Sequence, residues 1–477
     1  MAGETSITDT PLKVLALAAT ILFLSTSEIY RLYFINKDGT PLSRMAFMAL
    51  GVAFVPFFTL REWVMTVLAF VLSLAIWLSG DAGDITNALN RAAFFGAFIY
   101  LVTLLKEAAQ RSRSVLALGT YMTQQPQGRR YFSLSIGGHI LGVLLNFGAI
   151  SLLTPLIQRG SKAMLAKAEL RQSGEAQLEQ QQISALLRGF SWMIMWSPTA
   201  LTQAVLFTSI HGASASIVVS LGIGASLVMI LIGRAVDHYE WRHLRRAAIA
   251  RESVFPTPSA RRFGFICACL VGITFGVVLS SDVNAAIALM LVAPAMMLVW
   301  VYAQQFAADR AHALRATAGV IYEILIRSAR QPAQSAYVLG IAGYIGVLAA
   351  AIAPVGEFAV FFEDTDIPTW AFLSALPILI ILGGQLALSP ILVVVFLAAL
   401  INELPVLPAD PNLIIFALGA GWALSMTASP NASATLLISS ITRIAPTTLT
   451  WRWNGGYSTI CFLVFTAFFV VMSLSPE

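Results

Sequence analysis

Long hydrophobic runs, separated by short polar or charged segments, cover most of the chain. They fall at about residues 12–34, 45–60, 63–79, 91–106, 132–157, 187–208 and 213–234, and then at 263–281, 285–303, 335–355, 369–402, 412–441 and 457–474. A helix needs about 20 predominantly apolar residues to cross the hydrocarbon core of a bilayer. The pattern therefore predicts an all-α polytopic membrane protein.

Composition excludes a water-soluble protein and a nucleic-acid-binding one. Hydrophobic residues make up 58% of the chain and charged residues 11%, which is too little charge for a soluble fold of this size. The net charge of +5 does not indicate a nucleic-acid partner, because the basic residues lie beside the ends of the apolar runs, where the positive-inside rule places them. Arginine outnumbers lysine, as in GC-rich bacterial genomes. We therefore expect a multi-pass protein of the bacterial cytoplasmic (inner) membrane, in contact with the lipid bilayer.

Charged loops assign a direction to each run, with basic loops placed in the cytoplasm and acidic loops outside. Run 132–157 has basic stretches at both ends, so we expect it to enter the membrane from the cytoplasm and return. Run 369–402 has acidic loops at both ends, so we expect a second re-entrant hairpin that opens to the opposite side. The N-terminus is then cytoplasmic and the C-terminus external.

This layout predicts about 11 transmembrane helices and two hairpins, arranged as two five-span repeats of opposite orientation. The predicted parts are an extra N-terminal transmembrane helix, a first repeat with one hairpin and one broken helix, a basic cytoplasmic linker, and a second repeat of the same plan. Their bounds are 1–44; 45–235, with hairpin 132–157 and broken helix 187–208; 236–262; and 263–477, with hairpin 369–402 and broken helix 412–441.

Two of the apolar runs are interrupted by the same kind of sequence, Ser197-Pro198-Thr199 and Ser429-Pro430-Asn431. Proline removes a backbone donor and clashes with the preceding turn, so each helix should open there. Paired interrupted helices in the two halves of a chain indicate a transporter's binding site. The alternative is a simple proline kink, which would be favoured if only one such sequence were present. The polar side chains around the breaks that we expect to bind a solute are Ser197, Thr199, Thr202, Gln203, Asn431, Ser433 and Thr435.

The expected tips of the two hairpins carry small and amide residues. Glycine permits close approach and unusual backbone angles, and the amides of asparagine and glutamine supply hydrogen bonds at the middle of the membrane. The alternative is helix packing through small residues. The tip residues that we add to the predicted substrate site are Asn146, Gly148, Gly383, Gly384 and Gln385.

Ionisable residues at membrane depth are few: Glu28, His139, His211 and Glu403. Each lies near a predicted end of a run, where exposure costs little, so a structural role is favoured for each. The sequence contains no Walker motif, no catalytic serine–histidine pattern and no dinucleotide fingerprint. We therefore expect no enzymatic activity and no resident cofactor. Backbone carbonyls freed at Ser197, Pro198, Ser429 and Pro430 could hold Na⁺ as a coupling ion, with H⁺ as the alternative.

The layout of two inverted five-span units, each with a hairpin followed by a broken helix, resembles the ion transporter superfamily over about residues 45–474. That group includes the divalent-anion:sodium symporters and the large membrane subunits of tripartite carriers. The resemblance implies that hairpin tips and broken helices enclose the solute, that the domains bearing the hairpins move as elevators against a scaffold, and that the protein is a homodimer.

The sequence thus predicts an ion-coupled secondary transporter that moves a small polar, anionic solute by alternating access. One alternative is a membrane-embedded enzyme acting on lipid-linked sugars, which would need reactive groups in the acidic loop 357–366. Another is a non-catalytic membrane subunit of a larger complex, for which the cytoplasmic connectors 107–130, 158–186 and 305–334 leave room.

Overall fold

The computed structural model describes residues 11–34, 41–79, 82–168, 172–242, 254–281, 283–354, 367–402 and 406–474, together with residues 356, 357, 360, 365 and 404. Every regular element in these ranges is a helix. Nine helices of the described residues are long and apolar enough to cross a membrane, and three shorter apolar helices are Pro41–Phe57, Thr369–Gln385 and Pro390–Asn402. The predicted fold class, an all-α polytopic membrane protein, is confirmed.

Contacts divide the chain into two compact units, and each unit takes segments from both halves of the chain. Unit 1 is Met1–Ala108 with Ile273–Ala351, and unit 2 is Ala109–Gly272 with Ile352–Glu477. The predicted repeats, 45–235 and 263–477, therefore each contribute helices to both units.

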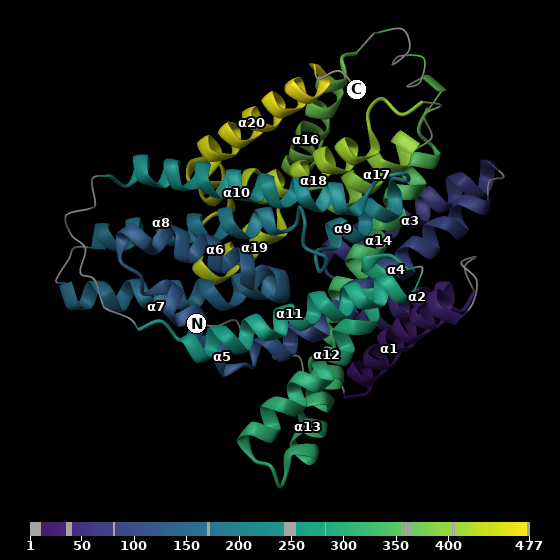
Figure 1. Cartoon of the computed structure of the whole chain (residues 1–477). Helices are drawn as coiled ribbons and strands as arrows, with labels where there is room; N and C mark the ends of the chain where they lie inside the picture. The colour runs from purple at the N-terminus through teal and green to yellow at the C-terminus, as the bar shows by residue number, and fades with distance from the viewer. Residues whose placement is uncertain are drawn as a thin grey trace. The chain divides into compact units, whose positions relative to one another are not determined.

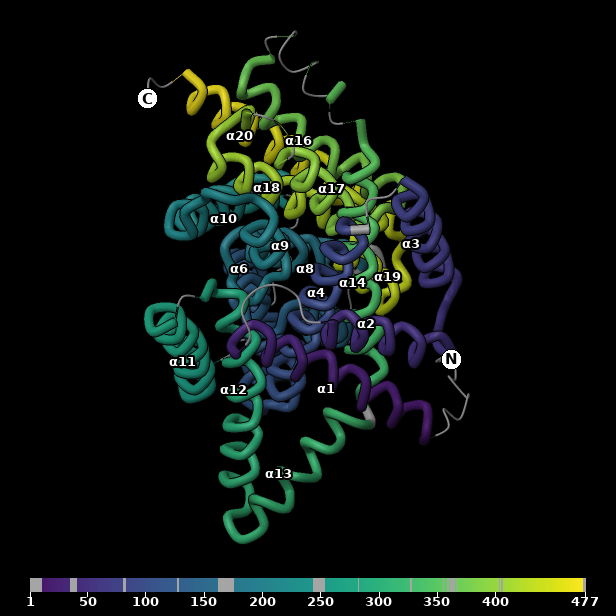
Figure 2. The backbone as a smooth tube through the Cα atoms, turned by 90° about the vertical axis from the view of Figure 1, so that its right-hand side faces the viewer, coloured from purple at the N-terminus to yellow at the C-terminus, as the bar shows by residue number. Residues whose placement is uncertain are grey.

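Unit 1 contains the helices that flank the predicted hairpins and broken helices. α12 and α13 join at a turn into a helical hairpin, which both views show (Figure 1, Figure 2). The elements of unit 1 are α1 (Pro11–Phe34), α2 (Pro41–Phe54), the 3-10 helix η1 (Val55–Phe57), α3 (Leu60–Ser79), most of α4 (Ala82–Gln110), the end of α11, α12 (Ala285–Ala308), α13 (Ala313–Tyr322), the π-helix η3 (Glu323–Arg327) and α14 (Arg330–Ala351).

α3 and α14 run parallel, held together by paired hydroxyl groups. The side-chain oxygens of Thr66 and Tyr337 lie 2.7 Å apart, and those of Ser73 and Tyr344 also lie 2.7 Å apart. The partners are 271 residues apart in both pairs, so residue numbers rise together along the two helices. The predicted orientation requires this, since it takes runs 63–79 and 335–355 outward in the same direction.

Unit 2 contains both predicted hairpins and both predicted broken helices. Its elements are α5 (Arg113–Thr123), α6 (Gln127–Leu145), α7 (Phe147–Ala168), α8 (Gln172–Met193), α9 (Leu201–Ser209), α10 (Ala215–Glu240), most of α11 (Thr257–Ser280), α16 (Thr369–Gln385), α17 (Pro390–Asn402), α18 (Pro411–Ala428), α19 (Ser433–Thr442), the π-helix η4 (Thr448–Arg452) and α20 (Gly455–Leu474).

We call α6–α7 hairpin 1 and α16–α17 hairpin 2. Each turns through one residue other than glycine with a positive φ, Asn146 at 49° and Ala387 at 63°. The broken helices are α8–α9 and α18–α19, and we call residues 194–200 break 1 and residues 429–432 break 2. Break 1 contains the pair Ser197-Pro198, and break 2 begins with the pair Ser429-Pro430. Proline has no backbone N–H to donate to the hydrogen bonds of a helix. Re-entry of the two hairpins from opposite membrane faces stays a prediction.

The observed helices extend beyond the apolar runs. α8 begins at Gln172 rather than at residue 187, because the polar residues before the run are good helix formers. Hairpin 1 covers residues 127–168 rather than 132–157 for the same reason. Of the predicted linker 236–262, residues 236–240 continue α10 and residues 257–262 begin α11, while residues 243–253 lie outside the described part of the chain.

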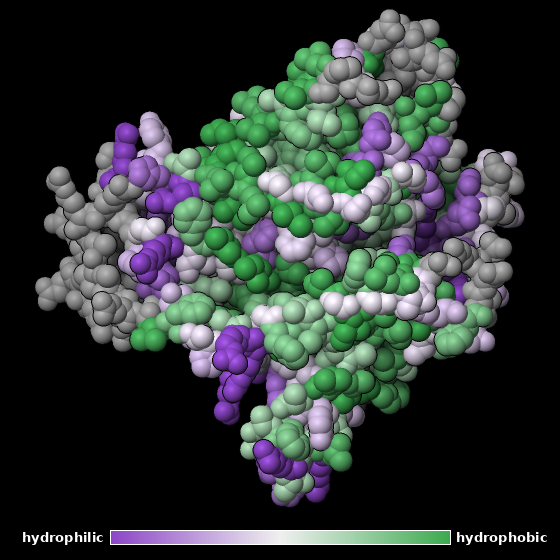
Figure 3. All heavy atoms as spheres, in the orientation of Figure 1, coloured by the Kyte–Doolittle hydropathy of each residue, from purple (hydrophilic) through white to green (hydrophobic). Residues whose placement is uncertain are grey.

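The two halves of unit 2 exchange packing partners. α9, which follows break 1, packs against α17 of hairpin 2, and α19, which follows break 2, packs against α7 of hairpin 1. The hairpins and broken helices therefore form one body. Its outer helix α20 presents hydrophobic side chains, as membrane lipid requires (Figure 3).

Candidate functional site

Break 1 and break 2 share one turn geometry. The carbonyl oxygen of Ser197 accepts a hydrogen bond from the backbone N–H of Ala200 at 3.0 Å, and that of Ser429 accepts from Ala432 at 3.2 Å. In both breaks the acceptor is the serine of the Ser-Pro pair and the donor is the residue before the next helix. The two sequences thus produce the same local fold twice, which a chance proline kink would not.

A side chain from the helix after each break donates back to a carbonyl at the start of the break or just before it. Gln203 Nε2 donates to the carbonyl of Ile194 at 3.2 Å and to that of Met195 at 2.5 Å. Thr435 Oγ1 donates to the carbonyl of Met426 at 3.0 Å. The Gln203–Ile194 and Thr435–Met426 pairs are both nine residues apart. These side chains satisfy carbonyls that the missing helical turn leaves without partners, as buried backbone groups require.

The residue after each Ser-Pro pair binds the hairpin of its own half. Thr199 Oγ1 donates to the carbonyl of Val143 in α6, so the hydroxyl of Ser197, 2.8 Å away, donates to Thr199. Asn431 Nδ2 donates to the carbonyls of Gly384 and Gln385 at the end of α16, at 3.0 and 3.4 Å. Each break is therefore tied to the end of the first arm of a hairpin.

Glycines bring the first half of each broken helix against the same hairpin arm. A Cβ atom built on Gly189 would lie 2.0 Å from the carbonyl oxygen of Ser135 in α6, and one on Gly421 would lie 2.8 Å from Cα of Pro377 in α16. A Cβ atom on Gly384 would lie 2.9 Å from Cβ of Ser429. Hairpin and broken helix therefore pack with almost no side chain between them.

The two breaks differ in exposure. Break 1 is closed: Ser197 is 0% exposed, and Thr199, Thr202 and Gln203 are also buried. Break 2 is partly open, because Asn431 is half-buried and Ser433 is exposed, although Thr435 is buried. Gln385 is half-buried beside it and accepts a hydrogen bond from the exposed ring N–H of Trp451 at 3.3 Å. Break 2 therefore exposes more of its polar side chains than break 1.

The predicted tip residues divide into two groups. Gly384 and Gln385 lie against break 2, and Gln385 Nε2 also donates to the carbonyl of Ala428 at 3.0 Å. Gly383 instead faces Val393 in the second arm of its own hairpin. Asn146 forms the turn of hairpin 1, and Gly148 lies in the first turn of α7; Val143 rather than either of them makes the contact with Thr199.

Of the four carbonyls expected to ligate Na⁺, two already accept a turn hydrogen bond, those of Ser197 and Ser429. The carbonyls of Pro198 and Pro430 accept no backbone hydrogen bond from the residues that the structure describes. The turn hydrogen bond of each break thus leaves the proline carbonyl unused.

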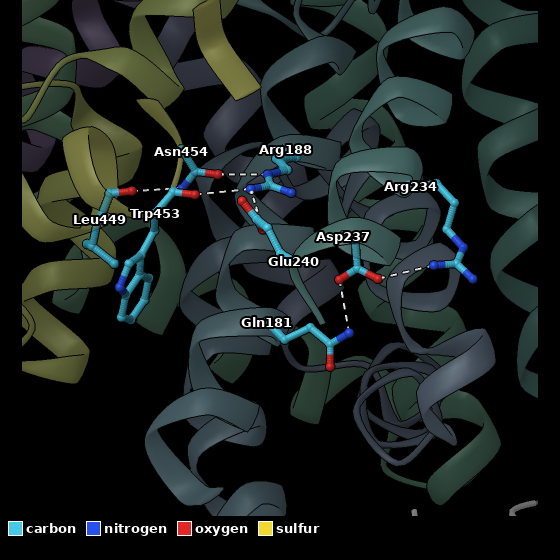
Figure 4. Close-up of polar contacts among 8 residues, drawn as sticks. All are labelled: Gln181, Arg188, Arg234, Asp237, Glu240, Leu449, Trp453 and Asn454. Atoms are coloured by element: carbon cyan, nitrogen blue, oxygen red, sulfur yellow. Dashed lines mark hydrogen bonds and ion pairs between the residues drawn. The ribbon is translucent and has the colours of Figure 1, made fainter. Parts of the chain in front are cut away.

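A largely buried polar cluster that the sequence did not reveal joins α8 to α10 and to the start of α20 in unit 2. Arg188, which belongs to the basic stretch that follows run 132–157 in the sequence, is 1% exposed in α8. Its Nε donates to Asn454 Oδ1 at 2.8 Å, and its Nη2 donates to the carbonyl of Trp453 at 3.0 Å and lies 3.5 Å from Glu240 Oε2 (Figure 4). The guanidinium also lies 4.8 Å from the ring centroid of Tyr457. Arg188 thus joins the first broken helix to the start of α20, from the other half of the chain.

The cluster continues along α10. Gln181 Nε2 donates to Asp237 Oδ1 at 2.9 Å, and Arg234 Nη1 donates to Asp237 Oδ2 at 3.3 Å (Figure 4). Arg130, at the start of hairpin 1, donates to Gln181 Oε1 at 3.1 Å. Burial lowers the pKa of Arg130 to about 10, and the charge of Asp237 opposes that change. The paired and hydrogen-bonded charges indicate a structural joint, because buried charges persist only with partners.

Comparison with known proteins places the fold. No protein-family model matches the chain, and no curated protein matches it. Among solved structures, the YdaH transporter of Alcanivorax borkumensis matches with a TM-score of 0.53 at 15% identity, covering 83% of this chain and 88% of that one. MtrF of Neisseria gonorrhoeae matches with a TM-score of 0.50 at 14% identity, covering 83% of each chain. The chain shares the fold of these two transporter structures.

The likeness to YdaH and MtrF extends over both units. The sequence identity is too low to transfer the roles of individual residues from those proteins to this chain. It agrees with the coarse prediction of a transporter architecture. Membership of the ion transporter superfamily stays a prediction, as do the bounds of the repeats and the identity of the site residues.

Proposed function

We propose that the protein is a secondary transporter that moves a small polar, anionic solute across the membrane by alternating access. The observation that carries this proposal is the agreement between break 1 and break 2: the same turn, the same nine-residue return bond, and the same tie to a hairpin. Paired interrupted helices in the two halves of a chain mark the binding site of secondary transporters.

The chemistry of the breaks favours an anionic or neutral polar solute. α9 and α19 begin directly after the breaks, and their N-cap residues, Ala200 and Ala432, supply no capping side chain. The backbone N–H groups at such helix starts carry partial positive charge and attract anions. Residues 187–208 and 412–441, which surround the two breaks, contain no Asp or Glu that would repel an anion. At break 2, Asn431, Gln385 and Ser433 add the amides and hydroxyl that would orient the solute.

The coupling ion we propose is Na⁺, held by the carbonyls of Pro198 and Pro430, or H⁺. Because hairpins and broken helices all belong to unit 2, that unit can carry the solute as one body, which supports an elevator motion of unit 2 relative to unit 1. We also propose a homodimer in the bacterial cytoplasmic membrane, on the resemblance stated for the sequence. MtrF is described as one of a class of antimetabolite efflux pumps, so export is the direction to test first.

Flux through proteoliposomes tests the proposal. The purified protein should move one or more labelled organic anions faster when a Na⁺ or proton gradient is imposed. Asn431→Ala removes two hydrogen bonds to hairpin 2 and should lower flux about tenfold or more, since one such bond contributes about 1 kcal/mol or somewhat more. Ser440→Ala is the matched control, because Ser440 is exposed on α19, the helix that follows break 2, and its hydroxyl bonds the carbonyl of Leu437 in that helix. Equal flux in Asn431→Ala and wild type would refute the assigned site.

A further inference from the structure

Both ring nitrogens of His139 are bound, one to α8 and the other to break 1. Nδ1 lies 2.9 Å from the carbonyl oxygen of Gly189, and the indole N–H of Trp196 donates to Nε2 at 2.9 Å. The imidazole and indole rings also stack, with centroids 5.7 Å apart. The His139 side chain is buried. A histidine on hairpin 1 thus holds two points of α8 and break 1 at once.

These partners fix the protonation state of the ring. A carbonyl oxygen can only accept, so Nδ1 must carry a hydrogen. An indole N–H can only donate, so Nε2 must be without one. The arrangement therefore requires neutral imidazole in a single tautomer. With a second proton on Nε2, the N–H of His139 and the indole N–H of Trp196 would both be donors pointing at each other. The hydrogen bond between them would be lost.

Loss of the hydrogen bond between His139 and Trp196 would directly affect break 1. Trp196 immediately precedes Ser197, and the next tie between break 1 and hairpin 1 is the bond from Thr199 to Val143. In neutral form His139 therefore holds the part of break 1 before the Ser197-Pro198 pair, while Thr199 holds the part after it. Protonation would leave break 1 with one of these two attachments, and closed break 1 is what keeps Ser197 and Thr199 inaccessible.

No charged group offsets the added proton within the described part of the chain. The helices packed against α6 are α5, α7, α8 and α10. On α8, Arg188 is bound to Asn454 and Glu240. α10 meets this level of α8 near Ser226 and Gly222, which contact Trp192 and Met195. Glu179 on α8 accepts a hydrogen bond from Gln158 at 3.0 Å. The other titratable and charged side chains described on these elements make no hydrogen bond or ion pair with His139, whose partners are Gly189 and Trp196; they include Arg113 and Tyr121 on α5, Arg129, Arg130 and Tyr131 on α6, Arg159 on α7, and Arg234, Asp237, His238 and Glu240 on α10.

We propose that His139 is a proton-binding residue that latches break 1 to hairpin 1 when neutral and releases it when protonated. Its meaning for transport rests on the proposed function, since an opened break 1 would expose the second of the two paired sites to solute. The latch itself is a property of unit 2 and can be measured without a known solute.

Hydrogen–deuterium exchange of the peptide covering residues 190–203 tests the latch in detergent-solubilised protein. If the closed form excludes the protonated ring, and the opened ring titrates near pH 6.5 as an ordinary imidazole, opening should increase about thirtyfold from pH 8 to pH 5 after correction for intrinsic exchange. The sign follows from the closed form's need for neutral imidazole: protection is complete above pH 6.5 and is lost as the pH falls below it.

Three variants make the test specific. His139→Gln can still donate to Gly189 and accept from Trp196 but cannot titrate, so its protection should not change with pH. Trp196→Phe removes the indole donor, so exchange should be high at every pH. His211→Gln changes an exposed histidine outside the latch and should keep the wild-type pH dependence. A wild type without pH dependence, or His139→Gln with the wild-type response, overturns the proposal, and neither result bears on whether Asn431 binds solute.

Discussion

Glycines lie at the contacts between the hairpins and the broken helices. Replacing them with alanine should show whether close packing or helix propensity decides the stability at each position. Alanine at Gly189 would place its Cβ atom 2.0 Å from the Ser135 carbonyl oxygen, and alanine at Gly421 would place it 2.8 Å from Cα of Pro377. Both neighbours are backbone atoms that cannot rotate away. Gly419, on the same helix as Gly421, meets only Leu206 Cδ1 at 3.7 Å, so Gly419→Ala is the matched control.

The expected change in the free energy of unfolding has one sign for Gly419→Ala and the opposite sign for Gly189→Ala and Gly421→Ala. Alanine in place of glycine inside a helix stabilises by roughly 0.5–1 kcal/mol where there is room, and we expect that gain at Gly419. Overpacking costs about 1–3 kcal/mol and sometimes more, so Gly189→Ala and Gly421→Ala should be less stable than wild type. Gly189→Ala should be the worse, because its clash is with a carbonyl at the shorter distance.

Heat inactivation of the purified protein measures this order. Membrane proteins of this size often unfold irreversibly, so the temperature of half-loss of folded protein after a fixed heating time is the suitable quantity. The expected order is Gly419→Ala, wild type, Gly421→Ala, Gly189→Ala, from most to least stable. If Gly189→Ala and Gly421→Ala are as stable as Gly419→Ala, hairpins and broken helices do not pack as described.

Further variants test the remaining contacts. Arg188→Met should lower the free energy of unfolding by about 1–3 kcal/mol, because it leaves the buried side-chain oxygen of Asn454 without its donor, and Arg188→Lys should recover only part of this loss because lysine lacks the planar fork. Thermal unfolding of both variants checks this, and an Arg188→Met variant as stable as wild type would contradict the structural joint. Tyr344→Phe removes the hydroxyl contact with Ser73 in unit 1 and should cost about 1 kcal/mol while leaving solute affinity unchanged, which a binding assay can show. Thr199→Val removes the hydroxyl that binds Val143 and should raise exchange in residues 190–203 at pH 8, where His139 alone would keep the latch closed.

The positions of the breaks could be predicted from the sequence because proline acts locally. Ser197-Pro198 and Ser429-Pro430 open their helices where the missing donor requires it, and the residues after them, Thr199 and Asn431, make the contacts with the hairpins. Glycine likewise indicated close approach at Gly384, which lies against Ser429.

Other features depend on residues far apart in the chain and could not be predicted in this way. Arg188 carries a charge in a basic stretch, so the positive-inside rule places it in the cytoplasm, yet partners 265 and 266 residues away bury it. For His139 the sequence favours a structural role, because this residue lies near the start of an apolar run. Its significance comes from the donor and acceptor chemistry of Gly189 and Trp196, which only the fold brings together.

The account depends most on the opposite orientation of the two hairpins, and labelling of single cysteines measures that directly. In a variant without Cys267, Cys269 and Cys461, one cysteine is placed at Arg129, exposed near the start of hairpin 1, or at Trp370, exposed near the start of hairpin 2. A membrane-impermeant maleimide is then applied to sealed vesicles of each orientation. The account predicts that the residue 129 cysteine reacts only from the cytoplasmic side and the residue 370 cysteine only from the external side. Labelling of both from the same side would contradict it.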